Sequence, residues 1–160
     1  MKIKSKLIGA VCSLCFSASM FAQTTWYFGN AGGLKFTGGV PGIIAGDAMN
    51  TGEGSAVLVN DANNVVMYTD GAKLWNGANT PQMGGGVVFN GHPSSTQTAL
   101  IVPIPGLECS KAFVFTVNAA ELGYGNGDNT RNNVRVSLVS YSGTAPATTI
   151  SCPAVDLNQH

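Results

Sequence analysis

The densest group of reactive side chains lies in His92–Gln97, which reads HPSSTQ. His92 beside Ser94 or Ser95 supplies the residue types of a base and a nucleophile. A hydrolytic triad also needs a group that orients the base and an oxyanion hole, and the nucleophile-elbow sequence GxSxG is absent. The segment therefore favours a loop whose hydroxyls satisfy backbone groups. His92, Ser94, Ser95 and Gln97 remain candidate ligand-binding residues at a rim of the fold.

Two further loops are rich in oxygen, Asp61–Asn64 (DANN) and Gly125–Asn129 (GNGDN). Calcium takes about six to eight oxygens, often from several carboxylates, and each loop offers one carboxylate. The glycine clusters Gly84–Gly86 and Gly123–Gly127 precede no predicted helix start, which a phosphate-binding loop needs. We therefore expect ordinary turns at these places, with no metal and no cofactor.

The carboxylates Asp47, Glu53 and Glu121 are spread too widely along the chain to be paired as an acid and a base. A glycosidase needs two carboxylates that face each other across a sugar, and only the fold can bring them together. The sequence alone thus assigns no catalytic residue.

Aromatic side chains offer a way to bind sugars by stacking. Trp26 and Tyr27 lie in the apparent strand Thr25–Phe28, so we expect both to pack in the core. Tyr124 lies in a polar loop and is the better candidate for an exposed aromatic contact.

The strands that position these groups are clearest in Ser55–Asn76, which predicts three short strands at Ala56–Asn60, Val65–Thr69 and Lys73–Trp75. The pair Asp70–Gly71 is typical of a two-residue hairpin turn, because glycine tolerates positive φ and aspartate caps its own turn. The stretch Tyr68–Trp75 also resembles the Asp-box turn of sialidase-like propellers, with a different spacing. That resemblance implies hairpin formers at Asp70 and Gly71 and a core position for Trp75.

Other strands are predicted on both sides of this meander. Gly29–Gly54 is glycine-rich and looks irregular, with short strands at Leu34–Phe36 and Ile43–Ile44. Later strands are expected in three segments and a short one near the end: Thr98–Pro103, Ala112–Asn118, Val134–Ser140 and Thr148–Ser151.

Alternation within two of these strands predicts which face is apolar. Phe113, Phe115 and Val117 share one face of their strand. In the next strand, Val134, Val136 and Leu138 face one way, and Arg135 and Ser137 point outward.

These segments together predict an all-β protein of antiparallel three- to four-stranded sheets. The strand starts at Ala56 and Thr98 lie about 42 residues apart, a spacing typical of propeller blades. The chain has material for a partial β-propeller of about two blades, with three blades as an open alternative, so residues 23–160 are expected to be an incomplete propeller-like region.

Residues 1–22 have the pattern of a secretory signal peptide. Lys2, Lys4 and Lys6 precede an uncharged, mostly apolar run over Leu7–Phe21, and cleavage is expected after Ala22. The run is shorter than the roughly 20 residues of a spanning helix, so no membrane span is expected once the signal is removed. We therefore expect a secreted or cell-surface protein.

Removal of the signal leaves a weakly acidic chain with a net charge near −3. Nucleic-acid binding needs clustered Lys and Arg, which the chain lacks. Cys109 and Cys152 remain after processing, and an oxidising compartment permits a disulfide between them. It would close a loop of about 43 residues, which is worth on the order of 4 kcal/mol; two buried thiols are the alternative.

Five strings of the chain resemble segments of a known family, and several of them occur in the family's order: WYFGN, NTGEGSAVLVND, VVMYTDGAKLWN, GHPSSTQTALIVPIPG and FVFTV. Over about Trp26–Val139 the chain resembles the N-terminal, propeller-like region of large bacterial surface proteins exported by the type IX route, several of them from gliding bacteria. In that family PKD-type domains and a C-terminal sorting domain often follow. The resemblance implies secretion and a propeller-like scaffold, and it carries over no catalytic residue.

The favoured function is a non-catalytic binding or adhesion scaffold with a carbohydrate or protein partner at the cell surface. Two alternatives remain open at this point. One is a fragment of a secreted glycan hydrolase whose active site is completed by missing blades, and the other is a structural spacer.

Overall fold

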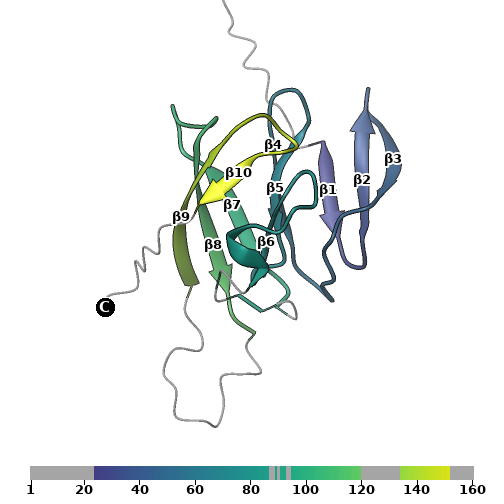
Figure 1. Ribbon diagram of the computed structural model, residues 1–160. Helices are drawn as coiled ribbons and strands as arrows, with labels where there is room; N and C mark the ends of the chain where they lie inside the picture. The colour runs from purple at the N-terminus through teal and green to yellow at the C-terminus, as the bar shows by residue number, and fades with distance from the viewer. Residues whose placement is uncertain (1–23, 87–88, 90, 93–94, 120–133, 152–160) are drawn as a thin grey trace, which may run out of the picture.

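The computed structural model describes residues 24–86, 89, 91–92, 95–119 and 134–151. Within these ranges the protein is all-β, with three antiparallel sheets and no α-helix (Figure 1). The described part of the chain contains no helix of the length and apolarity that a membrane span requires. The predicted signal peptide lies outside the described residues.

The three sheets follow one another along the chain. The first sheet consists of β1 (Thr25–Phe28), β2 (Gly32–Thr37) and β3 (Val40–Ala45). The second consists of β4 (Ala56–Val59), β5 (Val65–Thr69) and β6 (Leu74–Asn76), and a 3-10 turn follows at Met83–Gly85. The third consists of β7 (Ala99–Pro103), β8 (Lys111–Val117), β9 (Val134–Ser142) and β10 (Thr149–Ser151).

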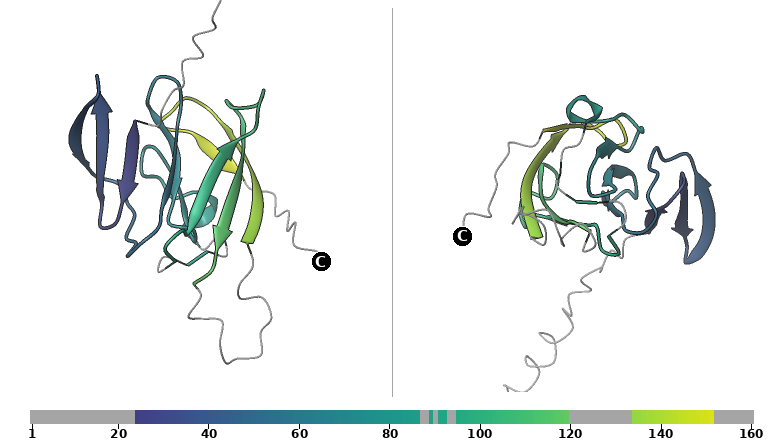
Figure 2. Two further views of the ribbon diagram at one scale, coloured as in Figure 1. Left: turned by 180° about the vertical axis from the view of Figure 1, so that it is seen from behind. Right: turned by 90° about the horizontal axis from the view of Figure 1, so that it is seen from below.

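Each sheet is a meander that starts at one edge and adds strands in chain order. Consequently β1, β4 and β7 are edge strands of their sheets, and they are neighbours: β1 lies beside β4, and β4 lies beside β7. The first strands of all three sheets therefore meet in one region of the molecule (Figures 1 and 2).

The sheets are stacked, and the second sheet is the middle layer (Figure 2). Every residue of β5 and β6 is buried. One apolar cluster fills the space between the first and second sheets, with Met49, Tyr68 and Trp75 at its centre. A larger cluster joins the second and third sheets and includes Met67 and Val114. Burial of apolar side chains on both faces of the middle sheet stabilises the stack.

The described residues form three sheets, the higher of the two numbers that the sequence left open, because the glycine-rich stretch Gly29–Gly54 contains β2 and β3. The short strands expected there are present and longer than predicted. Gly33 illustrates the misreading: a Cβ at this position would lie 2.6 Å from the carbonyl oxygen of Trp26 and 2.7 Å from Cδ1 of Tyr27, so glycine allows β1 to approach β2 closely.

The turn predicted at Asp70–Gly71 is present and is capped by the Asp70 side chain, but it is longer than predicted. Thr69 pairs with Leu74, so the connection holds four residues rather than two. Asp70 Oδ1 accepts hydrogen bonds from the N–H groups of Ala72 and Lys73, at 2.9 and 2.7 Å. The core position expected for Trp75 is also confirmed.

The apolar faces predicted for β8 and β9 are not the ones that form the core. Ala112 and Val114 are buried against the second sheet, whereas Phe113 and Phe115 lie on the outer, half-exposed face. In β9 the outer face carries Val134, Val136 and Leu138. Arg135 and Ser137 alternate with them and share the side of the buried Val139, so the outward orientation predicted for these two residues is wrong.

Candidate functional site

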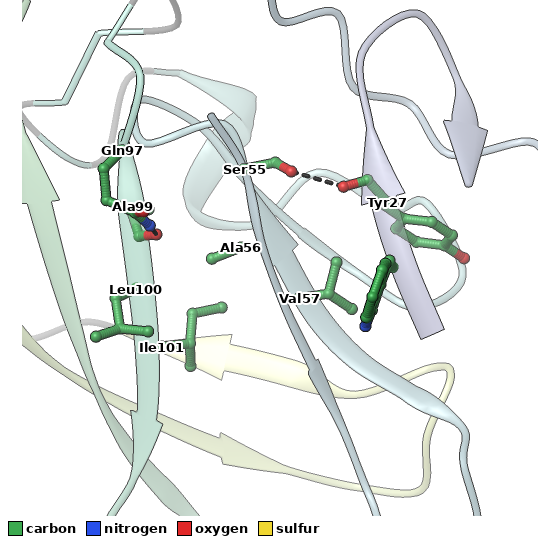
Figure 3. A pocket seen from close by; sticks show the side chains of 9 residues that line it. Tyr27, Ser55, Ala56, Val57, Gln97, Ala99, Leu100 and Ile101 are labelled. Atoms are coloured by element: carbon green, nitrogen blue, oxygen red, sulfur yellow. Dashed lines mark hydrogen bonds between the residues drawn. The ribbon is translucent and has the colours of Figure 1, made fainter. Parts of the chain in front are cut away.

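A pocket of about 210 Å³ lies where the first strands of the three sheets meet (Figure 3). Trp26 and Tyr27 come from β1, Ala56 and Val57 from β4, and Leu100 and Ile101 from β7, with Ser55 and Gln97 just before their strands. No single sheet could form this pocket, because its walls come from three separate meanders.

Two polar side chains line this pocket. The hydroxyl of Ser55 donates to the carbonyl oxygen of Tyr27 at 2.6 Å, which ties the start of β4 to β1 (Figure 3). The Nε2 of Gln97 donates to the carbonyl oxygen of Ala99 at 3.3 Å. Amide and hydroxyl groups set among apolar walls are typical of a site that binds a neutral polar ligand.

Trp26 also borders a second, open groove of about 710 Å³. Its ring lies against that of Phe36, with centroids 5.4 Å apart and planes tilted by 60°. Lys35 and Asn63 supply an ammonium group and an amide at the same groove. Asn63 is held there by Thr24, whose hydroxyl donates to Asn63 Oδ1 at 2.6 Å. Trp26 is thus shared by two adjoining hollows, and 49% of its surface is exposed.

The expectation that Trp26 packs in the core is therefore wrong, whereas for Tyr27 it is confirmed. Tyr27 packs edge-on against Tyr68, with ring centroids 5.0 Å apart. Alternation along β1 places the neighbouring Trp26 on the opposite face. Period-two alternation in the string TWYF could have shown that Trp26 and Tyr27 do not both pack in the core.

In the described part of His92–Gln97 (His92 and residues 95–97), the Thr96 hydroxyl donates to Glu53 Oε2 at 2.9 Å, whereas a backbone group was expected as its partner. The hydroxyl of Thr98 donates to the carbonyl oxygens of Ser95 and His92, at 2.6 and 3.2 Å. These hydrogen bonds link Thr98, just before β7, to the main chain of His92 and Ser95. Among the predicted rim residues, Gln97 lines the pocket, His92 and Ser95 do not, and Ser94 and Tyr124 lie outside the described residues.

A third pocket, of about 520 Å³, lies between the second and third sheets and is bordered by two carboxylates, Asp61 and Glu108. The Gly106 N–H donates to Glu108 Oε1 at 2.8 Å and holds the pKa of this exposed carboxyl below its usual range. A glycosidase acid needs the opposite shift, toward a raised pKa. Asp61–Asn64 forms the expected turn, closed by hydrogen bonds from Ala62 and Asn64 to the Asn60 side chain.

A buried carboxyl lies between the first and second sheets, away from all three hollows. Asp47 is 5% exposed; its Oδ1 accepts from the Met49 N–H at 2.8 Å, and its Oδ2 has no hydrogen-bond partner among the described residues. Burial raises the pKa of Asp47. Burial also raises the pKa of Tyr68 to about 12, with a further contribution from the nearby Asp47 charge. No acid–base pair involving Asp47 is formed in a cavity within the described part of the chain.

The predicted disulfide stays a prediction, because Cys109 is exposed while Cys152 lies outside the described residues. No group of three or more His, Cys, Asp or Glu side chains that could hold a metal ion occurs in the described part of the chain. The polar groups at the Trp26 hollows are thus hydroxyls, amides and one ammonium.

These hollows are the best-supported candidate site because they combine a half-exposed indole with several hydrogen-bonding groups. The chain matches no protein-family model, no curated protein and no solved structure.

Proposed function

We propose that this chain is a non-catalytic portion of a secreted or cell-surface protein and serves as a binding or adhesion scaffold. Its three sheets would be consecutive blades of a partial β-propeller. In support, each sheet begins with its edge strand β1, β4 or β7, these strands are neighbours, and the sheets stack face to face. Propeller blades are meanders of this kind arranged around a common axis.

The observation that carries the binding function is the position of Trp26 between two hollows. A flat indole face with hydrogen-bonding amides on both sides, Gln97 in the pocket and Asn63 in the groove, suits the alternating C–H and hydroxyl surface of a sugar ring. None of the described carboxylates, and neither His92 nor Cys109, lines these two hollows. The ligand class we propose is therefore a neutral carbohydrate that is bound without being cleaved.

The test is a glycan-array screen with the purified protein, followed by titration of any ligand found. Trp26→Ala should weaken binding at least about tenfold, in line with the loss of an aromatic anchor. Phe28→Ala is the matched control: Phe28 lies on the same strand, is 45% exposed and lines neither hollow. Equal binding by both variants, or no glycan binding at all, would refute the carbohydrate proposal.

A second candidate, a glycan hydrolase completed by further blades, is favoured by one observation, the presence of Asp61 and Glu108 at one pocket. The lowered pKa of Glu108 argues against it. Release of reducing sugar from a glycan, abolished by Glu108→Gln and unaffected by Glu53→Gln, would establish the hydrolase. A structural spacer, in contrast, predicts neither glycan binding nor turnover.

A further inference from the structure

The pocket and the groove that share Trp26 lie one after the other along β1 and β4. Two hydrogen bonds between the neighbouring segments mark their order. At the pocket the Ser55 hydroxyl donates to the carbonyl oxygen of Tyr27 at 2.6 Å, and at the groove the Thr24 hydroxyl donates to Asn63 Oδ1 at 2.6 Å (Figure 3). Because β1 lies beside β4, the two hollows form a single strip that follows both strands.

This strip is longer than one sugar ring. Thr24 and Tyr27 are three residues apart in extended chain, a distance of about 10 Å. The groove, with about 710 Å³, has more than three times the volume of the pocket, with about 210 Å³. Sites for ligands of moderate size have volumes of roughly 300–1,000 Å³, so the pocket lies below this range and the groove within it. The pocket therefore suits one ring, and the groove suits several.

The two ends of the strip present opposite hydrogen-bonding groups. At the pocket, Gln97 Nε2 donates to the carbonyl oxygen of Ala99, which leaves Gln97 Oε1 as an acceptor for a ligand. At the groove, Asn63 Oδ1 accepts from Thr24, which leaves Asn63 Nδ2 as a donor beside the ammonium group of Lys35. Sugar hydroxyls both donate and accept, so successive rings of a chain satisfy both ends. A single ring does not reach from one end to the other.

We propose that the ligand of this site is a linear oligosaccharide that fills the pocket and the groove together, an inference that rests on the proposed carbohydrate-binding function. One ring lies in the pocket and donates a hydroxyl to Gln97, and the following rings lie in the groove, where an oxygen accepts from Asn63. The half-exposed indole of Trp26 supports the chain where it passes from one hollow to the other. A monosaccharide held in the pocket alone would leave the groove unused.

The test measures affinity against chain length by calorimetry with the full chain. The probes are four neutral series, the cello-, laminari-, malto- and manno-oligosaccharides, each from one to six units. In a series that binds, affinity should rise at least about tenfold between the disaccharide and the longest members, because only these fill both hollows. It should then level off once the groove is full.

Two matched variants locate the groove end of the chain. Asn63→Asp keeps the Oδ1 that accepts from Thr24 and replaces the Nδ2 donor with an acceptor; aspartate also tolerates the positive φ of 59° at this position. It should weaken binding of the longest members about three- to tenfold and leave the disaccharide unaffected. Asn64→Asp places the same charge in the same turn on an exposed side chain that does not line the groove, and it should have no effect.

A third variant locates the pocket end. Gln97→Met removes the amide with little change in shape and should weaken every member of the series, the disaccharide included, about three- to tenfold. Circular dichroism of each variant verifies that it is folded.

The outcomes separate this inference from the proposed function. Equal affinity for the monosaccharide and the longest member, or a loss in Asn63→Asp that is the same at every length, would overturn the inference and leave carbohydrate binding intact. Binding by none of the four series would also overturn it, while the proposed function would still stand if the glycan array found another ligand. Absence of any glycan ligand refutes the proposed function itself.

Discussion

Tyr68 and Trp75 are cross-strand partners whose rings stack almost parallel, with centroids 5.4 Å apart and planes inclined by 11°. Tyr27 closes the group from the first sheet by packing edge-on against Tyr68. The Tyr68 hydroxyl accepts from the Ala48 N–H at 2.9 Å and donates to Asn79 Oδ1 at 2.8 Å. One side chain thus joins the stack of the first two sheets to the loop that connects them.

Tyr68→Phe should lower the free energy of unfolding by about 1–2 kcal/mol, because it keeps the stacked ring but leaves the Ala48 N–H without its acceptor. Urea denaturation followed by tryptophan fluorescence measures the change. Tyr27→Phe removes a hydroxyl from a half-buried ring of the same cluster and should cost less. If the two variants lose equal stability, the hydrogen bonds of Tyr68 do not have the structural role assigned to them.

The stability of the protein should fall between about pH 10 and pH 12. The pKa of Tyr68 is raised from 10.0 to about 12 by burial, so folding favours the protonated phenol. The stabilisation is fully present below pH 10 and is lost as the pH rises through 12, by roughly 2 kcal/mol. Denaturation at stepped alkaline pH measures it. Tyr68→Phe should flatten part of this slope, and Tyr141, whose pKa burial also raises to about 12, should account for another part.

Asp47→Asn should stabilise the protein at neutral pH, on the order of 1 kcal/mol, because it removes a buried charge and retains an acceptor for the Met49 N–H. Burial raises the pKa of Asp47, so the parent protein loses stability as the pH rises above the unfolded value of 3.8 through the raised folded value. The gain from the variant should therefore vanish in acid. Unfolding at neutral and acidic pH measures this, with Asp61→Asn as an exposed control; a gain independent of pH would contradict the argument.

The sequence predicts an element of this fold well when the residues that determine it are close together in the chain. The strand and turn residues around Asp70 are local signals, and they predicted the middle sheet well. The first sheet was underestimated because Gly33 allows a close approach to Trp26 and Tyr27 and does not belong to a loop. The composition shows only that glycine is frequent. The close contact that requires glycine at position 33 can be seen only once β1 and β2 are paired.

The candidate site was predicted only in part, for a related reason. Gln97 was identified as a rim residue, but its pocket is also formed by Trp26, about 70 residues earlier in the chain. Alternation shows that Trp26 and Tyr27 face opposite ways; it does not show which way the neighbouring sheet lies. The same ambiguity reversed the expected faces of β9, because both sets of side chains alternate correctly and stacking alone selects the buried set.

Gly71→Ala should be strongly destabilising, by more than about 2 kcal/mol, for two separable reasons. Gly71 has φ +85°, a conformation that costs a side chain roughly 1 kcal/mol. In addition, a Cβ at this position would lie 1.8 Å from Cγ2 of Thr98, at the entry to β7. This contact joins the turn of the second sheet to the loop that precedes the third. Thermal or chemical unfolding of the variant measures the total cost.

Two further variants separate the strain from the clash. Gly106 has φ +78°, and a Cβ added there would meet no atom within 4 Å, so Gly106→Ala should show the conformational cost alone. Thr98→Ser removes Cγ2 while it keeps the hydroxyl that binds Ser95, so in the Gly71→Ala background it should recover part of the lost stability. Because the Thr98 main-chain oxygen would still lie 3.1 Å from the new methyl group, recovery should be incomplete. If Gly71→Ala costs no more than Gly106→Ala, the close approach of the turn to β7 does not constrain the packing of the two sheets.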